Sequence, residues 1–241
     1  MKRAILFIFV LALAASAALP FAQISSAGNV NVRHTVIAVT GEASPIGGNY
    51  VPFSFINLSL NARHDVAFDA GVGAPNFTTG AFVGDGKTIS TVALGTNPDP
   101  AGPSFGSVTN PFITPNGDVV FDGNGSDVYK SDGKTIVPLV RDGDEMPGGG
   151  TLTRIGRATN DHGAITYSAI LSGSTGTQGV FRSDEKQTVA IARDDIPAPT
   201  GGTFTLFSNP AINDRGQVAF YSNLVGGSAD FGVFRGEGGD L

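Results

Sequence analysis

Short runs of alternating apolar and polar residues recur along the chain, separated by glycine, proline, asparagine and aspartate. One eight-residue phrase occurs four times, as NARHDVAF, TPNGDVVF, NDHGAITY and NDRGQVAF, beginning at residues 61, 114, 160 and 213. The steps between copies are 53, 46 and 53 residues, and a period of about 50 residues is typical of repeat architectures. Side chains two apart on a strand share one face, so we expect the aromatic residue that ends each phrase to be buried. These residues are Phe68, Phe121, Tyr167 and Phe220.

Three further elements recur in step with the phrase. A run with an aromatic residue and a turn begins at residues 80, 127, 179 and 232, for example GAFVGDGK and GVFRSDEK. A β-branched run, which we call the third-type strand, begins at 88, 135 and 187. A Gly/Pro loop then leads to a fourth run, which begins at 53, 105, 152 and 204. Each repeat is thus predicted to be four short antiparallel strands, with DGK as a hairpin turn.

Such a unit of about 50 residues cannot bury both of its faces alone, but stacked copies can. The sequence therefore predicts an all-β, β-propeller-like fold of four repeats. The N-terminal run HTVIAVTGEASPIGG, residues 34–48, aligns with QTVAIARDDIPAPTGG, residues 187–202. It is a third-type strand without earlier partners, whereas the last repeat lacks one. We therefore expect the N-terminal strand to close the array beside residues 232–235.

The geometry of a turn explains which residues recur in the four copies of the phrase. The leading Asn closes a turn through its side chain, and the Gly adopts a positive φ. His64 stands where that Gly is expected, and His162 lies in the same turn. We interpret both histidines as surface turn residues, since no zinc-type ligand spacing accompanies them.

With these residues in view, the chain resembles the bacterial secreted NxxGxxAF tandem-repeat (choice-of-anchor) proteins. The resemblance covers nearly all of the chain after residue 34. It rests on four phrases in register with the GVF…DG runs. The resemblance implies export and a repeat fold, and it implies no activity.

The N-terminus has the pattern of a signal peptide. Lys2 and Arg3 precede an apolar run from Ala4 to Ala15, and small residues follow. We expect a signal peptide at 1–22, a short linker at 23–33 and one β-repeat domain at 34–241. The protein is then secreted, extracellular or periplasmic, with no membrane span after cleavage.

Composition narrows the possible partners. The chain has no cysteine, so its stability must come from its own core. The net charge is −6, and removal of Lys2 and Arg3 makes it −8. Nucleic-acid binding needs clustered cations, and the chain has no basic run, so we expect no nucleic-acid partner. No cofactor motif is present, and we expect no cofactor.

Acidic residues in the Gly/Pro loops are the candidates for a ligand-binding face. They are Asp142, Asp144 and Glu145 in RDGDEMPGGG, and Asp194 and Asp195 in RDDIPAPTGG. Paired carboxylates can serve a hydrolase or lyase. The same loop recurs at Thr40 and at Gly95, however, which favours a structural turn. No residue is assigned as catalytic.

The segment DGNGSD alternates oxygen-bearing residues and weakly resembles a calcium loop. Its candidate ligands are Asp122, Asn124 and Asp127; a polar hairpin loop is the simpler interpretation. Sugar-binding surfaces usually use exposed aromatic rings. Trp is absent, and only Tyr50 and Tyr221 fall outside the repeat positions.

The sequence thus favours an exported, noncatalytic β-repeat module that interacts with an unknown extracellular ligand or cell-envelope component. Two alternatives stay open. One is a polysaccharide hydrolase or lyase that uses acidic loop residues, and the other is a structural protein of the extracellular matrix.

Overall fold

The computed structural model describes residues 33–52, 54–73, 76–100, 102–156, 159–208 and 210–238. The expected signal peptide and almost all of the linker lie outside these residues. Thr35–Leu241 forms one compact unit. Within the described ranges the chain forms eighteen strands and no helix, so no helix there can cross a membrane.

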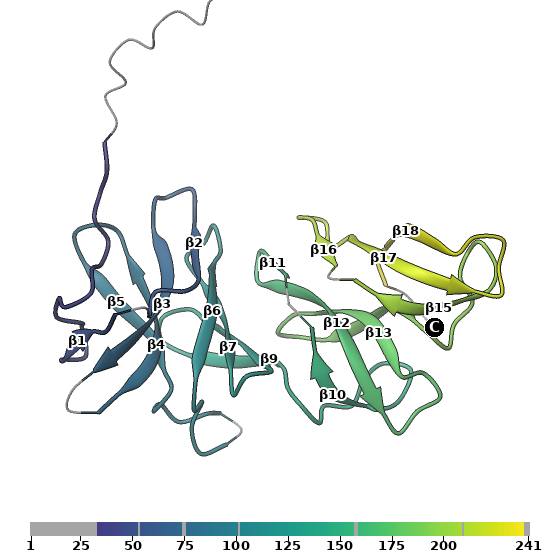
Figure 1. The fold of residues 1–241 in the computed structure, drawn as a ribbon, viewed down its shortest axis with the longest axis horizontal. Coiled ribbons are helices and arrows are strands. Elements are labelled where there is room, and N and C mark those ends of the chain that lie inside the picture. The colour runs from purple at the N-terminus through teal and green to yellow at the C-terminus, as the bar shows by residue number, and fades with distance from the viewer. Residues whose placement is uncertain are drawn as a thin grey trace, which may run out of the picture. The chain divides into compact units, whose positions relative to one another are not determined.

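The strands form four antiparallel sheets, which we number along the chain (Figure 1). Sheet 1 contains β1 (Asn49–Tyr50), β2 (Leu58–Leu60), β3 (Val66–Gly73), β4 (Thr78–Gly84) and β5 (Ile89–Leu94). Sheet 2 contains β6 (Val108–Ile113), β7 (Val119–Gly123), β8 (Asp127–Ser131) and β9 (Ile136–Val140).

Sheet 3 contains β10 (Thr151–Ile155), β11 (Thr159–Asp161), β12 (Ala164–Ser172), β13 (Gln178–Ser183) and β14 (Thr188–Arg193). Sheet 4 contains β15 (Thr203–Phe207), β16 (Ala211–Ile212), β17 (Val218–Val225) and β18 (Phe231–Gly236). Each sheet is built from consecutive strands, so the all-β, propeller-like fold predicted from the repeats is confirmed.

The strand before each phrase is irregular. Its pairing shifts between Thr109 and Phe112 in sheet 2, and between Phe204 and Leu206 in sheet 4. In sheets 1, 3 and 4 this strand is divided into two segments that both pair with the phrase strand. Such bulges bend the strand. The bend explains how one edge strand can follow the long phrase strand along its whole length.

A stacked pair of rings lies at the centre of every sheet. The last residue of the phrase faces the aromatic residue of the next strand, for example Phe68 opposite Phe82 and Phe220 opposite Phe234. The four centroid distances are 5.7, 5.7, 6.0 and 5.6 Å, with interplanar angles of 27°, 21°, 26° and 27°. Offset stacking of this kind is favourable beyond the burial of the rings. Phe68, Phe121, Tyr167 and Phe220 are all buried, as predicted.

A third large residue completes each centre. Tyr50, Phe105 and Phe204 meet the second ring of the pair edge to face, at 5.6, 4.8 and 5.1 Å, and Leu152 is the buried residue at this position in sheet 3. From the sequence, Tyr50 fell outside the repeat positions, because the fourth run of the first repeat was placed at Phe53. That interpretation was wrong. The strand begins at Asn49, and Tyr50 is 1% exposed.

Glycine in the GxF run has a steric reason. A Cβ added to Gly179 would lie 2.7 Å from Cε2 of Phe181, and one added to Gly232 would lie 2.8 Å from Cζ of Phe234. The ring lies back over the glycine two residues earlier. Repeat 2 has Asp127 at that position, and its ring lies over another glycine: a Cβ added to Gly123 would lie 2.8 Å from Cε2 of Tyr129.

The turns follow the predicted chemistry. Asn61 Oδ1 accepts hydrogen bonds from the backbone N–H of Arg63 and Asp65, at 2.9 and 3.0 Å, and Asn213 does the same in the last repeat. His64 and His162 have positive φ values of 68° and 46°, so both adopt the conformation that favours glycine. Both lie at the surface, as expected of turn residues.

Sheets 1, 2 and 3 each cover the aromatic centre of the next sheet with alanine or valine. Ala81 and Ala93 of sheet 1 pack on Phe105, Phe121 and Tyr129 of sheet 2. Val128 and Val140 of sheet 2 lie with Tyr167 and Phe181 of sheet 3, and Val180 and Ala192 of sheet 3 lie with Phe204 and Phe220 of sheet 4. The core is therefore a series of interfaces between neighbouring sheets.

Polar contacts join the same neighbours. Arg63 donates a hydrogen bond to the carbonyl oxygen of Asn116 at 3.0 Å, and Arg182 donates one to the carbonyl oxygen of Gly216 at 2.6 Å. Lys130 contacts Asp118 of its own repeat at 2.8 Å and Glu185 of the next at 2.7 Å. A cation of one repeat thus reaches the turn region of the following repeat.

The array is not closed by its N-terminal segment. Residues 33–39 form no strand, and Ile37 and Ala38 pack against Tyr50, Phe68 and Phe82 of sheet 1. Among the described residues β18 pairs with β17 alone. The prediction that residues 34–40 complete the last sheet was therefore wrong for this structure, because the segment is held by the first aromatic centre.

Six of the seven residues by which the step of 46 falls short of 53 are missing from one hairpin. The two rings of the stacked pair are 14 residues apart in repeats 1, 3 and 4, and 8 apart in repeat 2, where Phe121 faces Tyr129. The hairpin β7–β8 is shorter by an even number of residues. An odd change would turn one ring to the other face of the sheet.

Replacing Phe220 by Ala is expected to lower the free energy of unfolding by roughly 3–5 kcal/mol, because it leaves a cavity beside Phe204 and Phe234. Chemical denaturation followed by circular dichroism measures the loss. Phe231→Ala removes the same atoms from a side chain that is 65% exposed and should cost below about 1 kcal/mol. Equal losses for the two variants would contradict the assignment of Phe220 to the core.

Candidate functional site

The Gly/Pro loops before sheets 1, 3 and 4 share one backbone design. Ser44, Met146 and Ala198 each donate their N–H to the carbonyl oxygen of the glycine four residues later, at 2.9 Å in all three loops. Those glycines, Gly48, Gly150 and Gly202, have φ values of 74°, 87° and 76°. A side chain is strained at such angles, so the glycines recur for a structural reason.

The buried Arg193 and its partner Asp195 form a clamp on one of these loops. The Arg193 side chain is 1% exposed, and it donates to the two carboxylate oxygens of Asp195 at 3.0 and 3.1 Å. Its Nη1 donates to the carbonyl oxygens of Pro147 and Gly149 at 3.0 and 2.8 Å. This bidentate pair ties the loop that enters sheet 3 to the strand that leaves it. Hydrogen bonds from Arg193 lower the pKa of Asp195.

The other acidic candidates serve separate local contacts. Asp194 accepts hydrogen bonds from the N–H and the hydroxyl of Thr177, at 2.9 and 2.7 Å. Asp144 accepts one from the N–H of Arg141 at 2.8 Å. Asp142 and Glu145 are exposed, and Glu145 borders a cavity of about 480 Å³ with Met146 and Ser172. In the part of the chain that the structure describes, no three His, Cys, Asp or Glu residues gather as a metal site would require.

The three calcium candidates also point to different partners. Asp122 accepts a hydrogen bond from Asn110 Nδ2 at 2.7 Å. Asn124 Nδ2 donates to Asp99 at 3.1 Å, and Asp127 accepts from the Tyr129 hydroxyl at 3.2 Å and the Asp142 N–H at 2.8 Å. This geometry is that of a polar hairpin braced by hydrogen bonds.

Two buried polar groups were missed by the sequence analysis. Asp69 is 3% exposed, and its carboxylate accepts hydrogen bonds from the N–H groups of Ile56, Asn57 and Asn110, at 3.1, 2.8 and 3.2 Å. It joins the irregular edge strands of sheets 1 and 2, beside a cavity of about 230 Å³. The signal for it is the aspartate that follows the aromatic residue in repeats 1 and 2 only. Asp99 is also buried and accepts from the Tyr129 hydroxyl at 2.8 Å.

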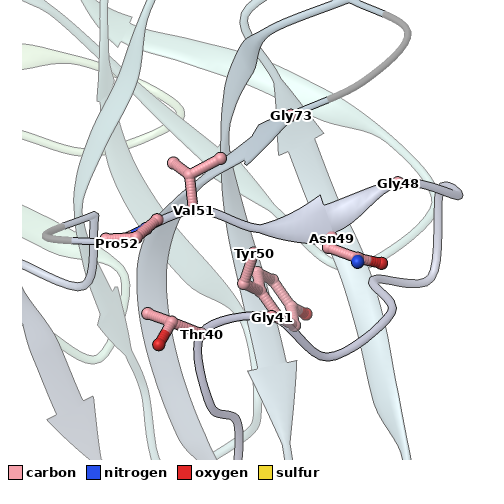
Figure 2. Close-up of a pocket in the computed structure, with 8 residues that line it drawn as sticks. All are labelled: Thr40, Gly41, Gly48, Asn49, Tyr50, Val51, Pro52 and Gly73. Carbon is pink, nitrogen blue, oxygen red and sulfur yellow. The ribbon is translucent and has the colours of Figure 1, made fainter.

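A cavity of about 630 Å³ opens at the first Gly/Pro loop (Figure 2). Its lining is mostly backbone and small or apolar side chains: Thr40, Gly41, Gly48, Asn49, Tyr50, Val51, Pro52 and Gly73. The cavity bordered by Glu145 occupies the corresponding loop of repeat 3. The same loop position thus forms a hollow in two of the repeats.

Tyr50 is the lining residue of this cavity that carries a buried polar atom. Its hydroxyl oxygen is buried and has no hydrogen-bond partner among the described residues. Burial, with the charge of Glu42 adding to it, raises the pKa of Tyr50 to about 12. The hydroxyl is therefore neutral at physiological pH and keeps a proton to donate. A buried donor without a partner is costly, so a water molecule or a ligand oxygen would stabilise this site.

The comparisons with known proteins identify the family. Residues 22–241 match the family of unknown function DUF7453, and the chain belongs to that family. No curated protein matches the chain.

Solved structures with a similar arrangement of strands are distant. The α-L-arabinofuranosidase Arb93A from Fusarium graminearum has a TM-score of 0.38 and 14% identity over 84% of this chain and 67% of its own. YCF48 from Cyanidioschyzon merolae has a TM-score of 0.35 and 15% identity over 78% of this chain and 59% of its own. A structure of YCF48 bound to D1 peptide has a TM-score of 0.32 and 13% identity over 83% and 69%.

Removal of the Asp195 carboxylate is expected to cost about 1.5–3 kcal/mol at neutral pH, because Asp195→Ala leaves the buried Arg193 without its anion. Asp142→Ala is the control, since Asp142 is exposed, and should stay within about 0.5 kcal/mol of the wild type.

The effect of Asp195 depends on pH with a definite sign. Its folded-state pKa is lowered, so its contribution is complete above about 3.9, the ordinary value for Asp, and is lost as pH falls through the folded pKa. Denaturant titrations of wild type and Asp195→Ala should therefore converge in acid. A difference that stays constant down to low pH would contradict the clamp.

Chelator treatment is expected to leave the melting temperature unchanged, because Asp122, Asn124 and Asp127 are engaged in separate hydrogen bonds. Calorimetry before and after treatment, with calcium added back, measures this. A fall of several degrees that calcium reverses would establish a metal site at that hairpin.

Proposed function

We propose that the protein is an exported, noncatalytic β-repeat module that binds a neutral extracellular or cell-envelope ligand at its loop cavities. The observation that carries the proposal is the cavity at Tyr50. It is large enough for part of a chain-like ligand, and its walls are backbone and small side chains. Its lining includes Tyr50, whose buried, neutral hydroxyl has no hydrogen-bond partner within the described residues.

The chemistry of this cavity favours binding over catalysis. General acid–base catalysis needs a titratable group whose pKa lies near the working pH. Tyr50 is the titratable residue of the lining, and its pKa of about 12 lies far above that range. The acidic loop residues that a glycosidase would use are divided among turns and the Arg193 clamp.

The negative charge of the chain disfavours anionic ligands. The chain carries a net charge of −6, and Glu42 lies near enough to influence Tyr50. An anionic polymer would be repelled, whereas a neutral polyhydroxylated one would offer oxygens to the hydroxyl and apolar ring faces to Val51 and Pro52. We therefore propose neutral glycans as the ligand class, and export and the envelope location as the setting.

A screen of neutral and acidic glycans and polymers against the full chain tests the proposal. Neutral ligands should bind, no product should be released, and Tyr50→Phe should weaken binding because it removes the hydroxyl alone. Tyr221→Phe makes the same change at an exposed ring and is the control. Release of shortened products would instead support a hydrolase or lyase, and unchanged binding by Tyr50→Phe would contradict the assignment of the cavity.

A further inference from the structure

The last sheet exposes a position that the other three sheets bury. The residue before the second ring of the stacked pair is Ala81, Val128 and Val180 in sheets 1–3, and these side chains are 0%, 2% and 0% exposed. The corresponding residue of β18 is Val233, which is 80% exposed. In sheets 1–3 that strand has a third-type neighbour, β5, β9 or β14. In the described part of sheet 4 it has none.

The N-terminal segment resembles a third-type strand but has no strand beside it among the described residues. Residues 35–39 pack on sheet 1 in the way that β14 packs on sheet 4. A Cβ added to Gly236 would lie 2.9 Å from Ile191 Cγ2, and one added to Gly84, the equivalent position of β4, would lie 2.7 Å from Ile37 Cγ2. A Cβ added to Gly238 would likewise contact the Val189 side chain, and one added to Gly86 would contact the Thr35 side chain.

The segment therefore lies on sheet 1 as a third-type strand that lacks a sheet of its own. Ala38 belongs to the first aromatic cluster, as Ala192 belongs to that of sheet 4. Within the ranges that the structure describes the segment has no strand partner, and Val36 and Val39 are 66% and 44% exposed.

We propose that copies of this chain join head to tail, with residues 35–39 of one copy added as the missing strand to β18 of another. This inference is independent of the ligand proposed above. Transfer of the β13–β14 register pairs Gly232 with Val39, Val233 with Ala38, Phe234 with Val36 and Arg235 with Thr35. Ile37 is then the bulged residue, as Ile191 is in β14.

The geometry of the repeats supports a second copy as the occupant. Sheets 1–2, 2–3 and 3–4 share hydrophobic clusters, and no cluster of the described residues joins sheet 4 to sheet 1. Addition of the strand would also bring Arg235 to the first turn of the incoming copy. Arg182, at the equivalent position, donates to the carbonyl oxygen of Gly216, and His64 holds that turn position in repeat 1. Such an interface is heterologous, so it leaves a free end on each side and permits growth beyond the dimer.

Sedimentation velocity of the full chain over a wide concentration range tests the proposal. The mean mass should rise with concentration above the 24.6 kDa of one chain and pass the dimer. Val233→Lys should abolish association, because it buries a charge in the interface. Val225→Lys changes another exposed valine of sheet 4 and should associate as the wild type does.

A proline pair tests the strand itself. Pro138 occupies the position of Val36 within β9, so that position tolerates the loss of an N–H. Val36→Pro should therefore retain association, whereas Thr35→Pro, one residue earlier in the ladder, should lose it. Circular dichroism of each variant checks that it is folded.

Mixing identifies the ends that meet. Thr35→Pro keeps an intact β18, and Val233→Lys keeps an intact N-terminal segment, so each should be a monomer alone and the mixture should form a dimer that grows no further. A wild-type chain that stays monomeric at every concentration would overturn the proposal. Association of Val233→Lys alone would also overturn it.

Discussion

The stacking of two rings across each phrase hairpin is the interaction on which the rest of this protein depends. The pair fixes the register of the hairpin, because an odd slip would turn one ring away from the core. It also fixes which face of the sheet is apolar. The glycine two residues before the second ring, the edge-to-face third side chain and the small residues of the preceding sheet all follow from the space that these rings occupy.

Because the aromatic centres of sheets 2, 3 and 4 are each covered by alanine or valine from the sheet before, stability is shared between neighbours. The clusters of Ala81 with Phe121 and of Val180 with Phe220 are of this kind. The chain contains no cysteine, so no covalent link supplements these interfaces. The pair of the buried Arg193 with Asp195 and the cations at the turns act at the edges of the same interfaces. An arrangement of this type is expected to behave as a linear series of units whose stabilities are coupled.

The periodic features of the fold were predictable from the sequence, and the features that occur once were not. The phrase predicted the strands, the burial of Phe121 and the turn at Asn61, because each depends on residues close in sequence. Tyr50 was missed because it precedes an irregular stretch of the edge strand, so that the apolar alternation restarts after it. The acidic loops at Asp144 and Asp195 look alike in sequence. Only the loop at Asp195 contains a buried arginine, Arg193. The hydrogen-bond partners of Arg193 are carbonyl oxygens 44 and 46 residues earlier in the chain, so the local sequence does not reveal them.

The even shortening of the β7–β8 hairpin shows where this architecture can vary. Residues beyond the stacked rings form an arm whose length is free as long as both sides change together, and repeat 2 has a shorter arm than the other three. Selection can therefore alter the tip of one repeat without disturbing the packing beneath it. For protein engineering, the same arms offer points at which foreign peptides of matched length can be displayed from a fixed scaffold.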